Sequence, residues 1–115
     1  MTERAPELLI ALVVRGGALT GCSRDSGASR AAQHRQYLFE LHCAGCHEQL
    51  HPELRKQPPK LAGLFSARAL PSGAPATDQQ ARKTILEGKG TMPAFDQRLS
   101  TDEVDELLKY LHTMK

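Results

Sequence analysis

The 115-residue chain is predicted to have an all-α fold, and two observations carry that prediction. Three segments show helical periodicity or helix start signals: residues 31–42, residues 77–88 and the residues that follow position 100. No segment alternates between polar and apolar residues in the way that a half-buried strand does. Because a chain of this length builds one hydrophobic core, we expect one helical domain.

The first predicted helix spans about Ala31 to His42 and leads directly into a cysteine motif. Beyond that motif the sequence is rich in proline, which cannot continue a helix. The prolines divide the segment between the first and middle helices into loops: Pro52, Pro58, Pro59, Pro71 and Pro75.

The middle and last helices carry clearer start and stop signals. The middle helix is expected to begin near Thr77 and Asp78 and to stop at Gly88. The last begins at Ser100, which forms a capping box with Glu103. Its apolar residues recur at the spacing of one helix face, and we expect this face to join the core: Val104, Leu107, Leu108 and Leu111.

Composition excludes several classes of protein and favours a bound cofactor. The formal net charge is +2 and no polybasic run is present, so no nucleic-acid-binding surface is indicated. No apolar stretch reaches the ~20 residues of a membrane-spanning helix. Aromatic residues make up only 4% of the chain, which is little for a small core. Three cysteines are too few for a disulfide scaffold, so a cofactor is expected.

The N-terminal residues have the pattern of an export signal. Residues 8–14 are an apolar block of the length found in signal peptides. Residues 19–22, Leu-Thr-Gly-Cys, resemble the lipobox of bacterial lipoproteins, which predicts lipidation of Cys22. The alternatives are ordinary secretion and a free thiol at Cys22. The domains expected are a lipoprotein signal peptide (1–21), a flexible tether (22–30) and a folded domain (31–115). The mature protein is then periplasmic and anchored to the membrane by lipid.

Residues 43–47, Cys-Ala-Gly-Cys-His, form the C-x-x-C-H motif that attaches c-type haem. Two thiols one helical turn apart can each add to one of two neighbouring vinyl groups of a porphyrin. The adjacent imidazole of His47 can then bind the iron from one side. This spacing predicts one haem, attached covalently through thioethers to Cys43 and Cys46 and ligated by His47.

Three other interpretations of the same motif remain open. A thioredoxin-like redox pair is one, although that motif starts a helix and this one is expected to end a helix. A zinc site is another, in which Cys43, Cys46 and His47 are joined by His42 or His51. The third is a structural disulfide between the two cysteines.

Met92 is the candidate for a second iron ligand. It lies in a Gly-Thr-Met-Pro-Ala-Phe segment, where Pro93 stiffens the backbone beside the thioether. A thioether favours reduced iron, and Met/His ligation raises the reduction potential. The alternative is that Met92 fills the core. Several histidines could also bind the iron, although each is more often a solvated surface residue: His34, His42, His51 and His112.

From about Arg30 onward the chain resembles a small class I cytochrome c of bacterial type. The resemblance rests on separated segments that occur in the family's order: residues 37–39, 43–47, 59–63, 91–95 and 106–111. It implies three main helices around one covalently bound haem. It also implies that the backbone carbonyl of Pro59 accepts a hydrogen bond from the ligand imidazole, which fixes the ring and raises its basicity.

One position departs from the family pattern. The family usually carries Gly or Ala eight residues before the first motif cysteine, where the first and last helices cross closely, and this chain has Arg35. Either the Arg35 stem lies flat with its guanidinium in water, or the helices lie farther apart. Because the aromatic pair Phe39 and Tyr110 is present, we expect the crossing to be kept.

The function predicted is that of a one-electron carrier between a donor and an acceptor protein outside the cytoplasmic membrane. With both axial positions filled, no site for a substrate is open, so the chain is not expected to be an enzyme. The alternatives are a haem sensor or peroxidase-like protein with a detachable Met92, and a haem subunit of a larger membrane oxidoreductase.

Overall fold

A computed structural model of the chain describes residues 24–115. The predicted signal peptide and Cys22 lie outside the described residues. The elements in chain order are α1 (Arg24–Phe39), the π-helical turn η1 (Glu40–Ala44), α2 (Gly45–His47), the 3-10 turn η2 (Leu64–Ser66), α3 (Asp78–Glu87) and α4 (Thr101–Thr113). Pairing between extended segments is limited, over residues 24–115, to isolated bridges, so the predicted all-α class is confirmed.

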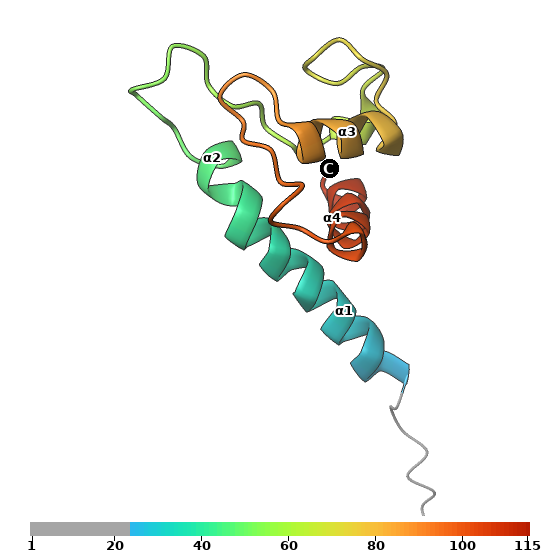
Figure 1. The fold of residues 1–115 in the computed structure, drawn as a ribbon. Helices are drawn as coiled ribbons and strands as arrows, with labels where there is room; N and C mark the ends of the chain where they lie inside the picture. Colours follow the sequence, from blue (N-terminus) through green and yellow to red (C-terminus); the bar gives the residue numbers. More distant parts are fainter. Residues whose placement is uncertain (1–23) are drawn as a thin grey trace, which may run out of the picture.

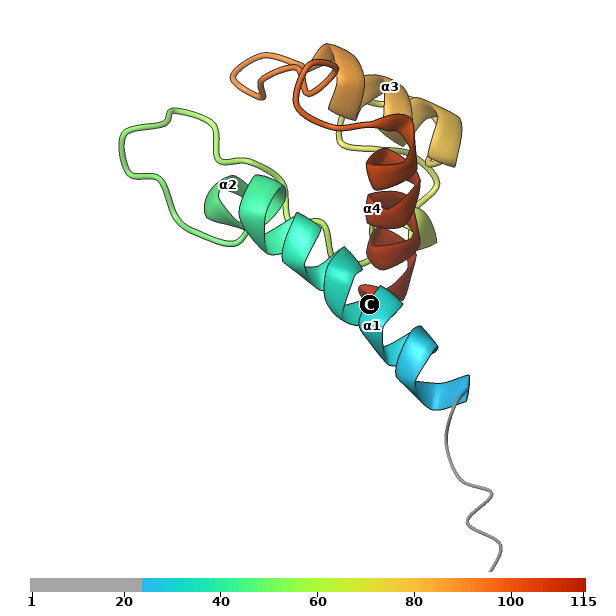
Figure 2. The same cartoon turned by 60° about the horizontal axis from the view of Figure 1, so that its bottom comes forward.

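The helices are arranged around the crossing of α1 and α4. Helix α1, η1 and α2 follow one another in a continuous helical run, which α4 crosses (Figures 1 and 2). Helix α3 packs on α4, and a long loop connects α2 to η2 (Figure 1). None of the helices within residues 24–115 has the length and apolar character needed to cross a membrane.

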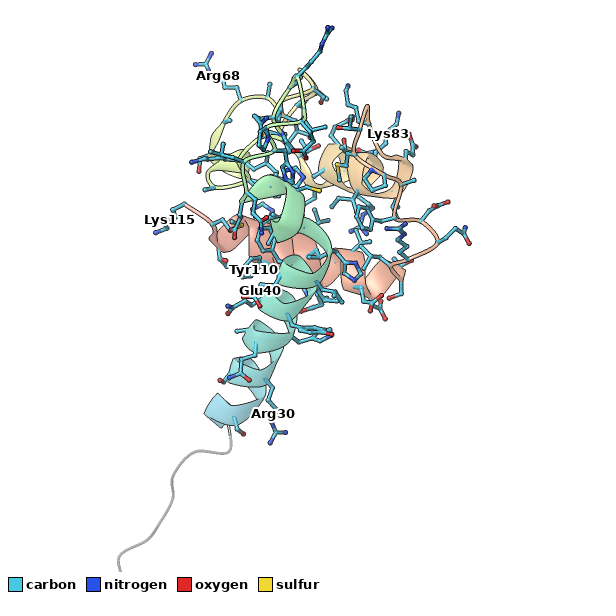
Figure 3. All side chains as sticks on the ribbon, turned by 90° about the vertical axis from the view of Figure 1, so that its left-hand side faces the viewer. Arg30, Glu40, Arg68, Lys83, Tyr110 and Lys115 are labelled. Atoms are coloured by element: carbon cyan, nitrogen blue, oxygen red, sulfur yellow. The ribbon has the colours of Figure 1, made fainter. Side chains whose placement is uncertain are left out.

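Helix α1 differs from its predicted bounds at both ends. It begins at Arg24 rather than Ala31, so residues 24–30, which the sequence assigned to a flexible tether, are helical. Residues 26–30 are exposed, and Arg30 projects from the free end of the helix (Figure 3). A helix that buries no face has no apolar periodicity, which is why the pattern did not predict it. At the other end, regular α-helix stops at Phe39 and a wider π turn continues to Ala44.

The crossing of α1 and α4 is kept in spite of Arg35. The rings of Phe39 and Tyr110 lie 5.0 Å apart between centroids, and Figure 3 shows Tyr110 beside the α1–η1 run. The Arg35 guanidinium is not left in water, because its Nε donates to Oε2 of Glu106 at 2.5 Å. Lys109 and Arg35 together lower the pKa of Glu106 to about 2. The crossing therefore accommodates Arg35 through an ion pair.

The caps predicted for α3 and α4 are confirmed. Thr77 accepts a hydrogen bond from the backbone N–H of Gln80, and α3 ends at Gly88. The Ser100 hydroxyl accepts from the Glu103 backbone N–H at 3.2 Å, and the Ser100 N–H donates to the Glu103 carboxylate at 2.8 Å. Both contacts satisfy groups that a helix N-terminus leaves without an intrahelical partner.

The hydrophobic core lies where α1, α3 and α4 meet. The apolar face predicted for the last helix is buried, and Phe39, Val104 and Leu107 are the largest side chains with almost no exposed surface. On the outside, an ion pair between Arg82 and Asp105 and a hydrogen bond between His112 and Asp78 join α3 to α4. The three helices thus form the packed part of the fold, and they fix the ends of the loops between them.

Candidate functional site

The cysteine motif lies at the end of the first helical run. Cys43 belongs to η1, whereas Cys46 and His47 belong to α2. Both thiols are free; Cys43 is half-buried and Cys46 is exposed. Burial, with a smaller contribution from Cys46, raises the pKa of the Cys43 thiol to about 11. A thioredoxin-like motif needs a lowered thiol pKa, so the structure favours neither that interpretation nor a disulfide.

His47 is oriented by the backbone of the following loop. Its Nδ1 lies 2.7 Å from the carbonyl oxygen of Pro59, the contact that the resemblance implied. A carbonyl oxygen only accepts, so Nδ1–H is the donor and the lone pair of the neutral ring is on Nε2. The ring nitrogen that a metal needs is therefore the one left available, and the bond to Pro59 raises its basicity.

Met92 lies in a tight turn packed against the end of α3. The backbones of Lys89 and Met92 exchange two hydrogen bonds, of 3.0 and 2.9 Å. Gly88 has φ of 73° and ψ of 170°, a backbone conformation that residues other than glycine rarely adopt. A Cβ at Gly88 would lie 2.6 Å from the Met92 carbonyl oxygen. The sequence predicted Gly88 only as a helix stop; its contact with the Met92 backbone depends on the fold.

Partly buried apolar side chains accompany the cysteine motif and Met92 in packing against the core. They come from the motif, residues 61–65, the end of α3 and the Met92 turn: Cys43, Ala44, Leu61, Leu64, Phe65, Leu86 and Met92. No polar or charged residue is buried among them or elsewhere in the described part of the chain. Two thiols, an imidazole, a thioether and an apolar surface are the set that haem c needs.

A pocket of about 200 Å³ adjoins the ring of His47. It is lined by Phe39, His47, Glu48, Lys60, Leu61, Ala62 and Met114. Met114, the penultimate residue, is held in place, because its carbonyl oxygen accepts from the Gly63 backbone N–H at 3.1 Å. Met114 thus lines the pocket beside His47, a position that no pattern along the chain predicts.

The other histidines are engaged elsewhere. His112 stacks on Phe65, with 3.9 Å between ring centroids, and bonds to Asp78. His42 meets the edge of Phe95, and His34 is exposed on α1. Both ring nitrogens of His51 contact oxygen atoms. Among residues 24–115 no three His, Cys, Asp or Glu side chains are grouped to hold a metal ion, so the zinc interpretation gains no support.

Comparison with known families identifies the class of protein. Residues 30–111 match the family described as "Cytochrome C oxidase, cbb3-type, subunit III". The chain belongs to this family. It is therefore a c-type cytochrome with covalently bound haem c, and it transfers electrons to and from redox partners rather than acting as an enzyme. Cytochrome c domains of this kind are typically extracytoplasmic. No curated protein matches the chain.

Proposed function

We propose that this cytochrome carries one haem c and passes single electrons between a donor protein and an acceptor protein outside the cytoplasmic membrane. Cys43 and Cys46 attach the haem, and His47 and Met92 are the two iron ligands. The observation that carries the proposal is the 2.7 Å contact of His47 Nδ1 with the Pro59 carbonyl, because it orients the imidazole and frees Nε2.

His47 and Met92 shift the reduction potential in opposite directions. The hydrogen bond to Pro59 makes the His47 ring more electron-rich, which stabilises ferric iron. The neutral thioether of Met92 stabilises ferrous iron and raises the potential. The bound haem supplies the redox chemistry, a gain and loss of one electron at iron. We propose that Met92 stays bound through the cycle, which leaves no open position for a substrate.

Mass spectrometry and optical spectroscopy of the native mature protein test this proposal together. We expect the mass of one haem on the polypeptide after acid–acetone treatment, and a Met–iron charge-transfer band that persists across neutral pH. Free haem in the extract, a second haem on the chain, or loss of the band at neutral pH would contradict it. Loss of the band alone would favour the sensor or peroxidase-like alternative with a detachable Met92.

A second candidate function is that of a haem subunit held permanently on a larger membrane oxidoreductase. The family's own description, as a subunit of an oxidase, favours it. Purification after mild detergent extraction separates the two functions. A carrier is expected to be purified without other chains, and a high salt concentration should not change this. A subunit is expected to be purified in constant proportion with larger chains that contain haem or metal.

We also propose that residues 1–21 are a lipoprotein signal peptide and that Cys22 carries the lipid. The export of c-type cytochromes and the small residues before Cys22 support this. Helix α1 already begins at Arg24, so residues 24–30 of the predicted tether are a helical extension about 10 Å long. Membrane fractionation tests the anchor: wild type is expected in the membrane fraction and Cys22→Ala outside it. A wild type that is already soluble would contradict the anchor and leave only export.

A further inference from the structure

The side chain of His51 joins the cysteine motif to the loop that follows it. Its Nε2 lies 3.0 Å from the carbonyl oxygen of Gly45, the residue between the motif cysteines. Its Nδ1 lies 3.1 Å from Oε1 of Glu53. The side chain is only 20% exposed, although it belongs to a surface loop. His51 is therefore not the solvated surface histidine that the sequence suggested.

The Gly45 carbonyl needs such a donor because the helix ends directly after the motif. Helix α2 stops at His47, and the last carbonyls of a helix have no intrahelical donor. The Ala44 carbonyl accepts from the backbone N–H of Glu48 at 2.9 Å. The next carbonyl, that of Gly45, accepts from His51 Nε2, since a carbonyl can only accept. His51 thus caps the turn that carries both thiols and His47.

Gln57 closes the same loop from its other end. Its Oε1 accepts from the His51 backbone N–H at 2.8 Å, and its Nε2 donates to the His51 carbonyl at 2.7 Å. Two residues later, the Pro59 carbonyl accepts from the ring of His47. The loop between Gly45 and Pro59 therefore begins at a contact with the motif backbone and ends at a contact with the proposed iron ligand.

Apolar burial contributes little to holding this loop. Leu50 is 86% exposed, and most residues from Pro52 to Gln57 are exposed as well. With little buried apolar surface, the order of the loop depends on its hydrogen bonds, which centre on His51 and Gln57. A substitution of either side chain should therefore disturb the position of Pro59 more than the packing of the core.

We propose that His51 is a positioning residue for electron transfer: by capping Gly45 it holds the 51–59 loop so that the Pro59 carbonyl keeps its hydrogen bond to His47. The inference rests on the proposed role of His47 as an iron ligand. Loss of the cap loosens the bond to Pro59, makes the imidazole less electron-rich and weakens its preference for ferric iron. The reduction potential then rises.

The test uses the haem-loaded protein and the variants His51→Phe, His51→Asn and Gln57→Ala. His51→Phe keeps a ring but removes the donor, whereas the amide of Asn can still donate to Gly45. Gln57→Ala opens the loop without touching the His51 ring, which provides a second variant if His51→Phe does not fold. His34→Ala, at the exposed histidine on α1, is the matched control.

Two measurements report on His47 rather than on folding alone. They are the midpoint potential and the hydrogen-exchange rate of the His47 Nδ1 proton, followed by NMR. We expect His51→Phe and Gln57→Ala to raise the potential and to speed this exchange by about threefold to tenfold, the effect of one weakened hydrogen bond. Exchange in α4 should not change. His51→Asn should restore both quantities toward wild type, and His34→Ala should leave them unaltered.

The failure of this inference is distinguishable from the failure of the proposed function. If wild type has the haem c spectrum with a bound methionine, but His51→Phe and Gln57→Ala share its potential and exchange rate, only the role of His51 is overturned. The same holds if both variants speed exchange throughout α4, because the effect is then general destabilisation. If wild type itself shows no iron-bound histidine, the proposed function fails, and the inference fails with it.

Discussion

The loop that follows His47 and the turn that carries Met92 differ in what holds them. The first is exposed and polar, and side-chain hydrogen bonds from His51 and Gln57 keep it closed. The second rests on the backbone of Gly88 and continues into buried Phe95, whose N–H donates to the Ile85 carbonyl at 3.0 Å. The position of His47 thus depends on side-chain hydrogen bonds, whereas that of Met92 depends on close backbone packing.

This difference predicts different consequences of mutation on the two sides. A lost side-chain hydrogen bond in an exposed loop shifts a local equilibrium by a modest factor. A side chain forced between two packed backbones displaces one of them, because interiors have no spare volume. Substitutions in the 51–59 loop should therefore change the site modestly, whereas a side chain added at Gly88 should displace the backbone of Met92.

The largest effect is expected where the motif attaches the cofactor. Cys43→Ser removes one of the two thiols and should abolish stable haem binding. Because aromatic residues are scarce and the core is small, most of the tertiary structure should be lost with the haem. Haem content and near-ultraviolet circular dichroism measure both losses. Retention of haem at the wild-type level in Cys43→Ser would show that this thiol does not attach it.

The next effect should come from replacing the proposed thioether ligand. Met92→His should keep a low-spin spectrum and lower the midpoint potential by on the order of hundreds of millivolts, because imidazole stabilises ferric iron relative to a thioether. Redox titration with optical detection is the measurement. A potential equal to that of wild type would mean that Met92 fills the core and that another residue binds the iron.

Gly88→Ala tests the backbone packing of the Met92 side. The added Cβ meets the Met92 carbonyl oxygen at 2.6 Å and the Ala94 nitrogen at 2.8 Å, in a conformation open only to glycine. We expect a loss of about 3 kcal/mol in the free energy of unfolding, together with a weakened Met–iron band. Denaturant unfolding and optical spectra follow the two.

Gly90 supplies the matched control for Gly88→Ala. It also has a positive φ, of 59°, but nothing lies within 4 Å of the position that its Cβ would take. Gly90→Ala should therefore cost only the conformational strain, about 1 kcal/mol, and keep the Met–iron band. Equal losses in the two variants would contradict a specific role for the contact between Gly88 and Met92.

The smallest effect concerns Glu106 at the crossing of α1 and α4. Its pKa is lowered from 4.5 to about 2, mainly by Lys109 and then by Arg35. A carboxyl whose pKa is lower in the folded state stabilises the fold above the unfolded pKa, and that contribution is lost as pH falls from 4.5 toward 2. Glu106→Gln should show a flatter decline of stability in this window. The difference between wild type and Glu106→Gln should become smaller at high salt, because the ion pairs of Glu106 with Arg35 and Lys109 are near the surface.

Unfolding by urea at pH 6 and pH 3, at low and high salt, measures this contribution. The comparison isolates the helix crossing, because the polar partners of Glu106 are Arg35 on α1 and Lys109 on α4. If wild type and Glu106→Gln lose stability in parallel between the two pH values, the ion pairs with Arg35 and Lys109 contribute nothing to folding.

The amino-acid sequence by itself determined the features that depend on near neighbours along the chain. The caps at Thr77 and Ser100, the stop at Gly88 and the apolar face of α4 each involve residues a few positions apart, and all are present. The order of the cysteine motif, Pro59 and the Met92 segment was enough to predict a class I c-type cytochrome, which the family match over residues 30–111 supports. Local hydrogen-bonding rules and helical periodicity operate before any tertiary contact exists, so such features are readable from sequence.

Only the tertiary structure decided the contacts between distant or oppositely running segments. The pairing of Arg35 with Glu106 joins residues 71 positions apart, and neither alternative considered for Arg35 contained it. The approach of Gly88 to the Met92 backbone, the Gly63 contact of Met114 and the His51 cap on Gly45 depend likewise on how loops fold back onto helices. Such contacts form because packing brings the groups together, and no pattern along the chain records which polar groups will then find each other.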